Sequence, residues 1–511
     1  MLAKVFSSGI QGIDAYPVEV EVDLARGLPK FNIVGLPDAA VKESKERVTS
    51  AIKNSEFDFP VRKITVNLAP ADIKKEGSSL DLSIAIGILK ASGRIKVDDL
   101  SGYTILGELA LDGKVRRING ALPIALELKE RGVKGLIIPE ENAREASVVK
   151  ELEVFPVKSL LQTAKFLDHE LSIEPYKYDL KKALKESSSY EVDFSEVKGQ
   201  LHVKRALEIA AAGSHNILMI GPPGAGKTML ARRIPTILPD LTLDEAIETT
   251  KLHSVAGLLF THQALVGIRP FRSPHHTISE AGLIGGGRIP RPGEISLSHN
   301  GVLFLDELSE FPRHVLESLR QPLEDGLVTI SRALTSITYP ARFMLVAAMN
   351  PCPCGYFGDP RRECSCTPLE VQKHLNKVSG PLLDRIDIHI EVAGVRREDL
   401  LGKGVGEPSP QIKKRVNQAR NIQLERFKRT SLYCNVQMNP KHIRRFCSPE
   451  KEAQDLLRSA ISELGLSARA YHRILKISRT IADLDSKERI NSAHISEALQ
   501  YRCLDRQLWR R

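Results

Sequence analysis

The sequence lacks any long apolar run, and its cysteines are few. A helix that crosses a membrane needs about 20 mostly apolar residues, and residues 1–6 do not form the apolar core of a signal peptide. The chain contains seven cysteines, and four of them fall between Asn350 and Pro368. This usage argues against a framework of disulfides and for a reducing compartment, and it leaves room for a bound metal. We therefore expect a cytoplasmic protein with no membrane partner.

Acidic residues are outnumbered: 73 Lys and Arg against 63 Asp and Glu give a formal net charge of +10. A basic surface suits a polyanionic partner such as DNA, although solvated basic faces are also common in proteins that bind no nucleic acid. The hydrophobic content of 42% is ordinary for a globular protein. A chain of 511 residues is long enough for about two to four domains, each with its own core.

The most specific motif is a phosphate-binding loop that matches G-x-x-x-x-G-K-[ST] without a mismatch. An apolar run at 217–220 predicts a buried strand before the loop, and residues 227–233 are compatible with a helix after it. The members of the loop are Gly221, Pro222, Pro223, Gly224, Ala225, Gly226, Lys227 and Thr228. Lys227 would reach the β- and γ-phosphates and Thr228 would bind Mg²⁺, while backbone N–H groups surround the phosphates. A turn rich in glycine and proline is the alternative, but the strand–loop–helix context favours a nucleoside triphosphate site.

A second motif ends another apolar strand with two acids. Residues 301–305 predict a buried strand, and Asp306 and Glu307 follow at its carboxyl end, where parallel sheets bind their ligands. Asp306 would hold Mg²⁺, directly or through water, and Glu307 would polarise the attacking water. The alternative is a strand that simply ends in acids.

Two further polar residues are candidates for catalysis. Asn350 follows a third apolar strand and could touch the γ-phosphate or the attacking water, or it could only form a turn before Pro351. Arg385 resembles an arginine finger, a planar cation that enters a neighbour's site and stabilises transition-state charge. The alternative is a surface arginine paired with Asp384 or Asp387.

The four clustered cysteines form two C-x-C pairs around a loop of nine residues. They are Cys352, Cys354, Cys364 and Cys366. Four thiolates on such a loop can surround one tetrahedral zinc, although the usual knuckle is C-x-x-C. Buried free thiols or a redox pair are the alternatives.

Residues 1–170 alternate between short strands, for example at 18–22 and 63–68, and helices, for example at 79–90. Two stretches in this region, 74–81 and 107–115, resemble the Lon-type protease fold.

In Lon proteases a serine and a lysine form the catalytic dyad, and Ser79 stands where the resemblance places the serine. Leu122 occupies the place of the lysine, and a serine without a base is a poor nucleophile. We expect an inactive, Lon-like structural domain.

Three stretches resemble the ComM/YifB family of magnesium-chelatase-like AAA+ ATPases: residues 269–277, 292–297 and 350–355. The resemblance covers nearly the whole chain and implies an α/β multidomain fold. The implied parts are a Lon-protease-like (ribosomal S5 domain 2-like) α+β domain at 1–170, a linker at 171–192, an AAA+ core at 193–394, a linker at 395–410 and a helical lid at 411–511. Arg469 matches the second sensor arginine of chelatase-like ATPases, which closes over the γ-phosphate.

Two insertions in the core are candidates for DNA contact. One spans about 268–291 and the other, which alternates like a β-hairpin, spans 328–338. The first carries Arg269, Arg272, Arg288 and Arg291, and the second carries Arg332. In helicases of this AAA+ branch, matching loops line the central pore of the ring and grip nucleic acid; ordinary surface loops are the alternative.

The resemblance implies a homo-hexameric ring that hydrolyses ATP with Mg²⁺ and moves on single-stranded or branched DNA. It further implies a helicase that promotes branch migration while incoming DNA is recombined in natural transformation, with recombination proteins as partners. The competing hypothesis is an ATP-driven protein remodeller, or a chelatase-type motor subunit, with the Lon-like domain as a docking platform.

Overall fold

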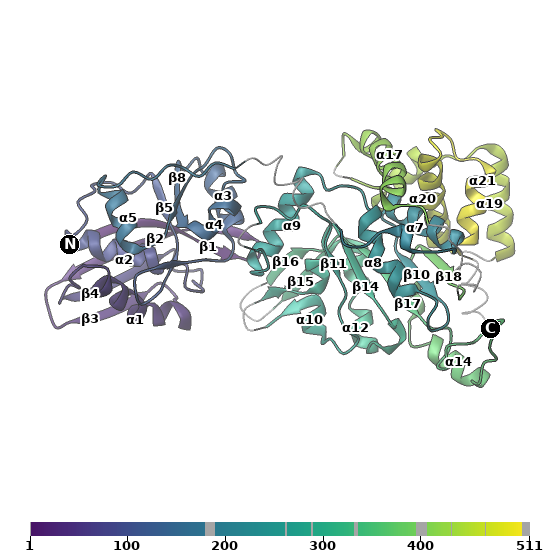
Figure 1. Ribbon diagram of the computed structural model, residues 1–511, viewed down its shortest axis with the longest axis horizontal. Coiled ribbons are helices and arrows are strands. Elements are labelled where there is room, and N and C mark those ends of the chain that lie inside the picture. The colour runs from purple at the N-terminus through teal and green to yellow at the C-terminus, as the bar shows by residue number, and fades with distance from the viewer. Residues whose placement is uncertain are drawn as a thin grey trace. The chain divides into compact units, whose positions relative to one another are not determined.

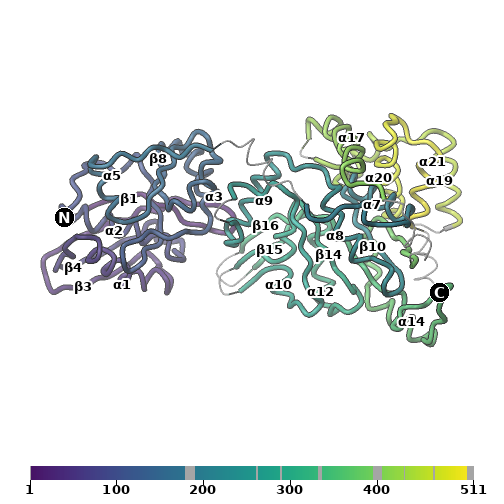
Figure 2. Tube along the Cα trace, in the orientation of Figure 1, coloured from purple at the N-terminus to yellow at the C-terminus, as the bar shows by residue number. Residues whose placement is uncertain are grey.

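The computed structural model describes most of the chain, and the described residues form two compact units. The described ranges are 2–178, 190–260, 263–287, 290–331, 336–394, 406–430, 432–464 and 467–502. Unit 1 comprises Met1–Ser188 together with Leu243–Gly267, and unit 2 comprises Ser189–Thr242 together with Ile268–Arg511. Figure 1 and Figure 2 show the course of the chain through each unit.

Unit 1 is built on a seven-stranded sheet in the order β3-β4-β2-β1-β5-β8-β9. Its strands are β1 (Leu2–Gln11), β2 (Asp14–Ala25), β3 (Lys30–Val34), β4 (Lys63–Ala69), β5 (Tyr103–Ile105), β8 (Gly135–Pro139) and β9 (Glu153–Val157), and β6 (Glu108–Leu109) and β7 (Val115–Arg116) form a separate hairpin. Its helices are α1 (Ala39–Asn54), α2 (Asp81–Ala91), α3 (Ala121–Glu130), α4 (Glu140–Ala146), α5 (Leu160–Leu167) and α9 (Leu243–Val255).

The sheet of unit 1 is covered by helices on both faces. The strands predicted at 18–22 and 63–68 and the helix predicted at 79–90 are confirmed within β2, β4 and α2. Alternate residues of β8 point into two separate apolar clusters, with Ile137 in one and Leu136 in the other. Helix α2 is buried along almost its whole length, because it lies on the sheet and also contacts α1 and α5.

Helix α9 belongs to unit 1 although the chain reaches it from the phosphate-loop region. It packs against α3, and the N–H of Gly120 donates to the carbonyl oxygen of Ser254 (3.3 Å). Lys251 Nζ also pairs with Asp14 Oδ1 at 3.0 Å. The boundaries predicted from the sequence do not separate residues 243–267 from the ATPase core at 193–394, and the structure does.

Unit 2 contains a five-stranded parallel sheet in the order β11-β14-β17-β10-β18. Its strands are β10 (Ile217–Ile220), β11 (Phe271–Arg272), β14 (Val302–Leu305), β17 (Met344–Met349) and β18 (Ile388–Glu391). Strands β10, β14 and β17 are buried at every position, as expected for a parallel sheet covered on both faces. The three apolar runs that the sequence predicts as strands are therefore neighbours in one sheet.

Helices surround this sheet and continue into a helical C-terminal part (Figure 1). The helices of unit 2 before the C-terminal part are α7 (Leu201–Gly213), α8 (Lys227–Ile237), α10 (Glu280–Ile284), α11 (Glu294–Leu297), α12 (Arg313–Glu317), α13 (Arg320–Asp325), α14 (Pro368–Leu375) and α15 (Gly380–Leu383), and α7 and α8 contact the sheet. The C-terminal helices are α17 (Ser409–Phe427), α18 (Pro440–Phe446), α19 (Lys451–Leu464), α20 (Ala468–Leu484) and α21 (Ser492–Gln500). Val416 of α17 and Ile477 of α20 lie in the same apolar cluster as Ile217 of β10.

The fold is thus an α/β multidomain architecture with a helical C-terminal part, as predicted. The Lon-like character of unit 1 remains a prediction. Within the described ranges, no helix is both long enough and apolar enough to cross a membrane.

Candidate functional site

The phosphate-binding loop has the predicted context, with β10 before it and α8 after it. Gly224 and Gly226 adopt left-handed φ angles of 75° and 86°, which favour glycine. A Cβ on Gly221 would lie 2.1 Å from the carbonyl oxygen of Val392, so the backbones approach too closely for a side chain. Because α8 begins at Lys227, the loop delivers a phosphate to the positive end of a helix.

The ammonium group of Lys227 lies at the mouth of this loop. It donates to the carbonyl oxygen of Gly221 (2.6 Å) and to Oδ1 of Asn350 (3.0 Å). Burial lowers the pKa of Lys227 to about 8, and the negative charges of Asp306 and Glu307 oppose that shift. A lysine held this way can exchange its protein oxygens for phosphate oxygens.

The acid pair contacts the phosphate-binding loop at the carboxyl ends of the strands. Thr228 Oγ1 donates to Asp306 Oδ2 at 2.6 Å, so the two predicted magnesium ligands are adjacent. A hydroxyl and a carboxylate are oxygen donors of the kind that Mg²⁺ prefers. Glu307 adopts a left-handed φ of 52°, and its Oε2 lies 3.5 Å from Nδ1 of His276.

Asn350 completes the group because β17 lies between β10 and β14. The carboxyl ends of these three parallel strands meet at one edge, which brings Lys227, Asp306 and Asn350 together. The carbonyl oxygen of Asn350 also contacts His374 Nε2 of α14 at 3.1 Å. Asn350 is therefore bound to the phosphate loop through its side chain and to α14 through its backbone.

The two predicted catalytic arginines, Arg385 and Arg469, both act on the carboxylate of Glu324. Arg385 is buried and forms an ion pair with Glu324, while its Nη1 donates to the carbonyl oxygen of Pro381 (2.6 Å). The hydrogen bond from Arg385 is the main cause that lowers the pKa of Glu324, and the charge of Arg469 adds to it. The carboxylate that pairs with the Arg385 guanidinium is that of Glu324, and not that of Asp384 or Asp387 as the alternative interpretation expected.

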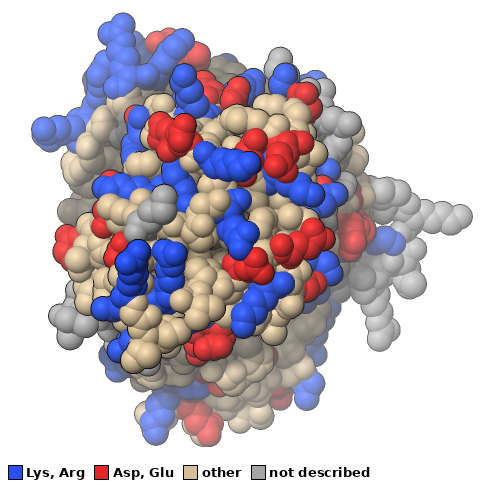
Figure 3. All heavy atoms as spheres, turned by 90° about the vertical axis from the view of Figure 1, so that its left-hand side faces the viewer, with Lys and Arg blue, Asp and Glu red and all other residues tan. Residues whose placement is uncertain are grey.

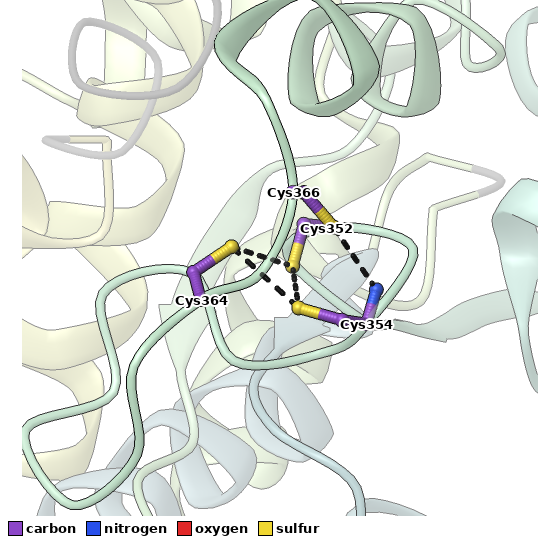
Figure 4. Close-up of side chains that lie close together, drawn as sticks. All are labelled: Cys352, Cys354, Cys364 and Cys366. Atoms are coloured by element: carbon purple, nitrogen blue, oxygen red, sulfur yellow. Dashed lines mark hydrogen bonds between the residues drawn. The ribbon is translucent and has the colours of Figure 1, made fainter.

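The four cysteines form a compact cluster, shown in Figure 4. The Sγ atom of Cys352 lies 3.4 Å from that of Cys354 and 3.6 Å from that of Cys364, and all four sulfurs lie within 4.8 Å of one another. Four thiolates around one tetrahedral zinc, at Zn–S distances of about 2.3 Å, lie about 3.8 Å apart. The N–H of Cys354 also donates to Sγ of Cys366 (3.3 Å). The donor set and its spacing therefore fit zinc.

The two candidate DNA-binding insertions form hairpins that pack on each other. β12 (Gly285–Gly286) pairs with β13 (Arg291–Pro292), and β15 (Leu327–Ser331) pairs with β16 (Ser336–Pro340). The hydroxyl of Tyr339 donates to the carbonyl oxygen of Pro290 (2.9 Å). The predicted hairpin at 328–338 is confirmed.

The arginines of these insertions differ in exposure and in their partners. Arg291 is exposed at the start of β13, whereas Arg288 and Arg332 lie outside the described residues. Arg269 is buried and donates to the carbonyl oxygen of Pro239 (2.6 Å), and Arg272 forms two hydrogen bonds with Glu294 (2.6 and 2.7 Å). Both guanidinium groups therefore have partners within unit 2, the carbonyl oxygen of Pro239 for Arg269 and the carboxylate of Glu294 for Arg272.

In unit 1, the stretches 74–81 and 107–115, which the sequence predicts to be Lon-like, are neighbours. The N–H of Gly107 donates to the carbonyl oxygen of Ser79 (2.9 Å). Leu122 is fully buried, and its N–H donates to Oε1 of Glu145 (2.9 Å). The inactive, Lon-like character of this region stays a prediction.

Sequence reasoning missed three residues that the structure places beside the predicted ones. They are His276 at Glu307, Glu324 at Arg385 and His374 at Asn350. His276 lies within the stretch 269–277 that carries the family resemblance, but spacing along the chain gives no sign that it meets the acid pair.

A parallel sheet with a phosphate loop, an acid pair and an asparagine at the ends of three adjacent strands defines a P-loop ATPase. Three family models match the chain: "Magnesium chelatase, subunit ChlI" at residues 193–400, "Subunit ChlI of Mg-chelatase" at 20–142 and "Magnesium chelatase, subunit ChlI C-terminal" at 406–502. The chain belongs to the magnesium-chelatase-like ComM/YifB family of AAA+ proteins.

Individual relatives cover nearly the full length. The chain is 46% identical over 511 residues to the competence protein ComM of Haemophilus influenzae, with 99% of this chain and 98% of the relative covered. It is 44% identical over 511 residues to the protein YifB of Escherichia coli, with 99% and 98% covered. A more distant relative is the chloroplastic magnesium-chelatase subunit ChlI of Oryza sativa, 23% identical over 325 residues, with 59% and 67% covered.

Proposed function

We propose that the chain is an ATP-driven motor that assembles as a homo-hexameric ring and moves on DNA in the cytoplasm. Its work would be helicase-driven branch migration during recombination of incoming DNA in natural transformation, together with recombination proteins. The observation that carries the ATPase is the convergence of Lys227, Asp306 and Asn350 at one sheet edge. The DNA substrate is supported by the net charge of +10 and by the similarity to a protein named for competence.

Each group at the sheet edge has a role in hydrolysis. Lys227 and the loop N–H groups bind the phosphates, and Thr228 and Asp306 would hold Mg²⁺, which supplies charge neutralisation at the β- and γ-phosphates. Glu307 orients the attacking water. Asn350 senses the γ-phosphate, because the lysine that it contacts is the one that binds this phosphate.

The position of Arg385 supports a shared site. Its guanidinium is paired with Glu324, and the charge of Arg469 acts on the same carboxylate, so the two cations lie near one acid. A ring in which each subunit supplies Arg385 and Arg469 to its neighbour would use both. When two subunits dock, the arginines would lose their contacts with Glu324 and become free to bind the γ-phosphate in the neighbour's site.

The hairpins are the proposed DNA contact because they carry the predicted arginines. The face drawn in Figure 3 carries Lys and Arg interspersed with Asp and Glu and with uncharged areas, so positive charge is not concentrated there. Arg291, with Arg288 and Arg332, is the proposed contact with DNA phosphates. We also propose that Cys352, Cys354, Cys364 and Cys366 bind one zinc ion.

A second candidate function is an ATP-driven protein remodeller or a chelatase-type motor subunit. The matches of residues 20–142 and 193–400 to models of a chelatase subunit favour it. The ATPase rate with and without single-stranded, duplex and branched DNA separates the two functions. Stimulation by DNA supports the motor on DNA, and an unchanged rate supports the remodeller.

A further inference from the structure

The cysteine cluster begins two residues after Asn350, at the end of β17. Sγ of Cys352 accepts hydrogen bonds from the N–H groups of Gly355 (3.2 Å) and Phe357 (3.3 Å), which fix the first turn of the loop around this sulfur. Cys352 itself is buried. The first cysteine is therefore continuous with the strand that positions the γ-phosphate sensor.

The same loop packs against the phosphate-binding loop. Gly355 adopts a left-handed φ of 87°, and a Cβ at this position would lie 2.5 Å from Cδ of Pro223. No side chain other than hydrogen fits between the two loops there. A displacement of the cysteine loop therefore removes the packing contact between Gly355 and Pro223.

The chain that leaves the cluster returns to Asn350. Thr367, directly after Cys366, caps α14, and its Oγ1 accepts from the N–H of Glu370 (3.3 Å). One turn further, the buried His374 contacts the carbonyl oxygen of Asn350 through Nε2 at 3.1 Å. Since a carbonyl oxygen only accepts, Nε2 carries the proton. Asn350 is thus held by both chain segments that enter and leave the cluster.

The loop between the cysteine pairs has little core of its own. Pro360, Arg361, Arg362 and Glu363 are exposed, and Gly358 adopts a left-handed φ of 78°. A short exposed loop that cannot bury enough apolar surface needs a crosslink or a metal to hold one conformation. While the four thiols are reduced, they supply that crosslink when an ion joins them.

We propose that zinc at the four cysteines controls ATP hydrolysis by fixing Asn350 and Pro223. The bound ion fixes the conformation of the loop, so that Asn350 keeps its hydrogen bond with Lys227 and Pro223 keeps its packing contact with Gly355. Loss of the ion loosens both, and the site retains nucleotide but no longer positions the γ-phosphate. This inference rests on the ATPase function proposed above.

The experiment uses the full chain, purified under reducing conditions with zinc and then divided into metal-loaded and chelator-treated samples. Metal content is measured by elemental analysis, nucleotide affinity by fluorescence of a labelled ATP and ADP, and turnover by phosphate release. We expect about one zinc per chain in the loaded sample. Chelation should lower kcat by about tenfold to a hundredfold and abolish the preference for ATP over ADP, because a small displacement of a positioned group has effects of this size.

Two variants separate metal binding from coupling. Cys364→Ser should lower zinc occupancy and reproduce the chelated state, whereas Cys434→Ala, which changes a buried cysteine outside the cluster, should retain both zinc and activity. His374→Phe should retain zinc yet lose much of the turnover, because it removes the contact with Asn350 and leaves the sulfurs in place.

Each outcome decides the proposal. The proposal is overturned if the sample purified with zinc contains no bound zinc. It is also overturned if the chelator-treated protein remains folded by circular dichroism and hydrolyses ATP at the parent rate. In the second case the ATPase function stands. If the zinc-loaded parent binds ATP but never hydrolyses it, with or without DNA, the proposed function itself fails.

Discussion

Nδ1 of His276 lies 3.5 Å from Oε2 of Glu307, the acid proposed to orient the attacking water. His276 belongs to the segment between β11 and α10, and this segment continues into the β12–β13 hairpin that carries Arg291. A movement of the hairpin can therefore reach the acid through a short stretch of chain.

The acid itself gives the first prediction. Glu307→Gln keeps the size and hydrogen bonding of the side chain but removes the carboxylate that orients water. We expect ATP binding to be retained and turnover to fall by about two orders of magnitude or more. Phosphate release together with labelled-nucleotide binding measures both effects. Turnover near the parent rate would show that another group activates the water.

The histidine gives the second prediction. His276→Ala removes the contact that holds the Glu307 side chain, so we expect a higher basal ATPase rate and a smaller relative stimulation by DNA. His275→Ala is the control, because the His275 ring lies 4.1 Å from that of His276 and its Nδ1 bonds to Thr277 (2.9 Å), whereas the described ion-pair contact of Glu307 is with His276. If His276→Ala and the parent have equal basal rates and equal stimulation, the histidine has no part in control.

Arg385 gives a prediction about assembly. Arg385→Ala and Lys227→Ala should each be inactive alone, yet a mixture of the two should recover part of the ATPase activity, because an intact site then forms at some interfaces. Co-assembly is verified by light scattering or pull-down of a tagged subunit. Mixed assemblies without any recovered activity would contradict the shared site.

The pKa of Lys227 predicts the pH dependence of nucleotide binding. Burial lowers this pKa to about 8, and a bound triphosphate favours the ammonium form, which raises the pKa in the complex. Below pH 8 the lysine is already charged. Above it, binding must take up a proton, so affinity should fall by up to about tenfold per pH unit until the pKa of the complex is reached.

Calorimetric titration in buffers of different ionisation enthalpy measures this proton uptake. Lys227→Arg is the control, because an arginine stays charged throughout the range and should remove the pH dependence. Equal affinity for the parent at pH 7 and pH 9.5, with no proton uptake, would show that Lys227 does not titrate as described.

The parts of the site that the sequence predicts are those that depend on local order along the chain. The phosphate loop and Asp306 each follow an apolar strand directly, and parallel strands bring their carboxyl ends to one edge, so Lys227, Asp306 and Asn350 could be grouped in advance. The cysteine spacing likewise limits where the four sulfurs can lie.

The features that the sequence does not predict depend on packing between distant segments. Glu324 is 61 residues from Arg385 in the chain, and no local pattern pairs them. Arg269 and Arg272 look like members of a basic patch, but the guanidinium of Arg269 is bound by a carbonyl oxygen and that of Arg272 by Glu294. The assignment of α9 to unit 1 also follows from tertiary contacts with α3 and not from composition.

The central claim is that ATP hydrolysis drives movement on DNA gripped by the hairpins. The most direct measurement is ATP-dependent unwinding of a labelled branched DNA by the parent and by a variant in which Arg288, Arg291 and Arg332 are all changed to Ala. We predict that the parent unwinds the substrate, whereas the variant keeps its basal ATPase rate, fails to unwind, and binds DNA with a shallower salt dependence. A variant that unwinds as well as the parent, or a parent with active ATPase and no unwinding of any branched DNA, would contradict the account.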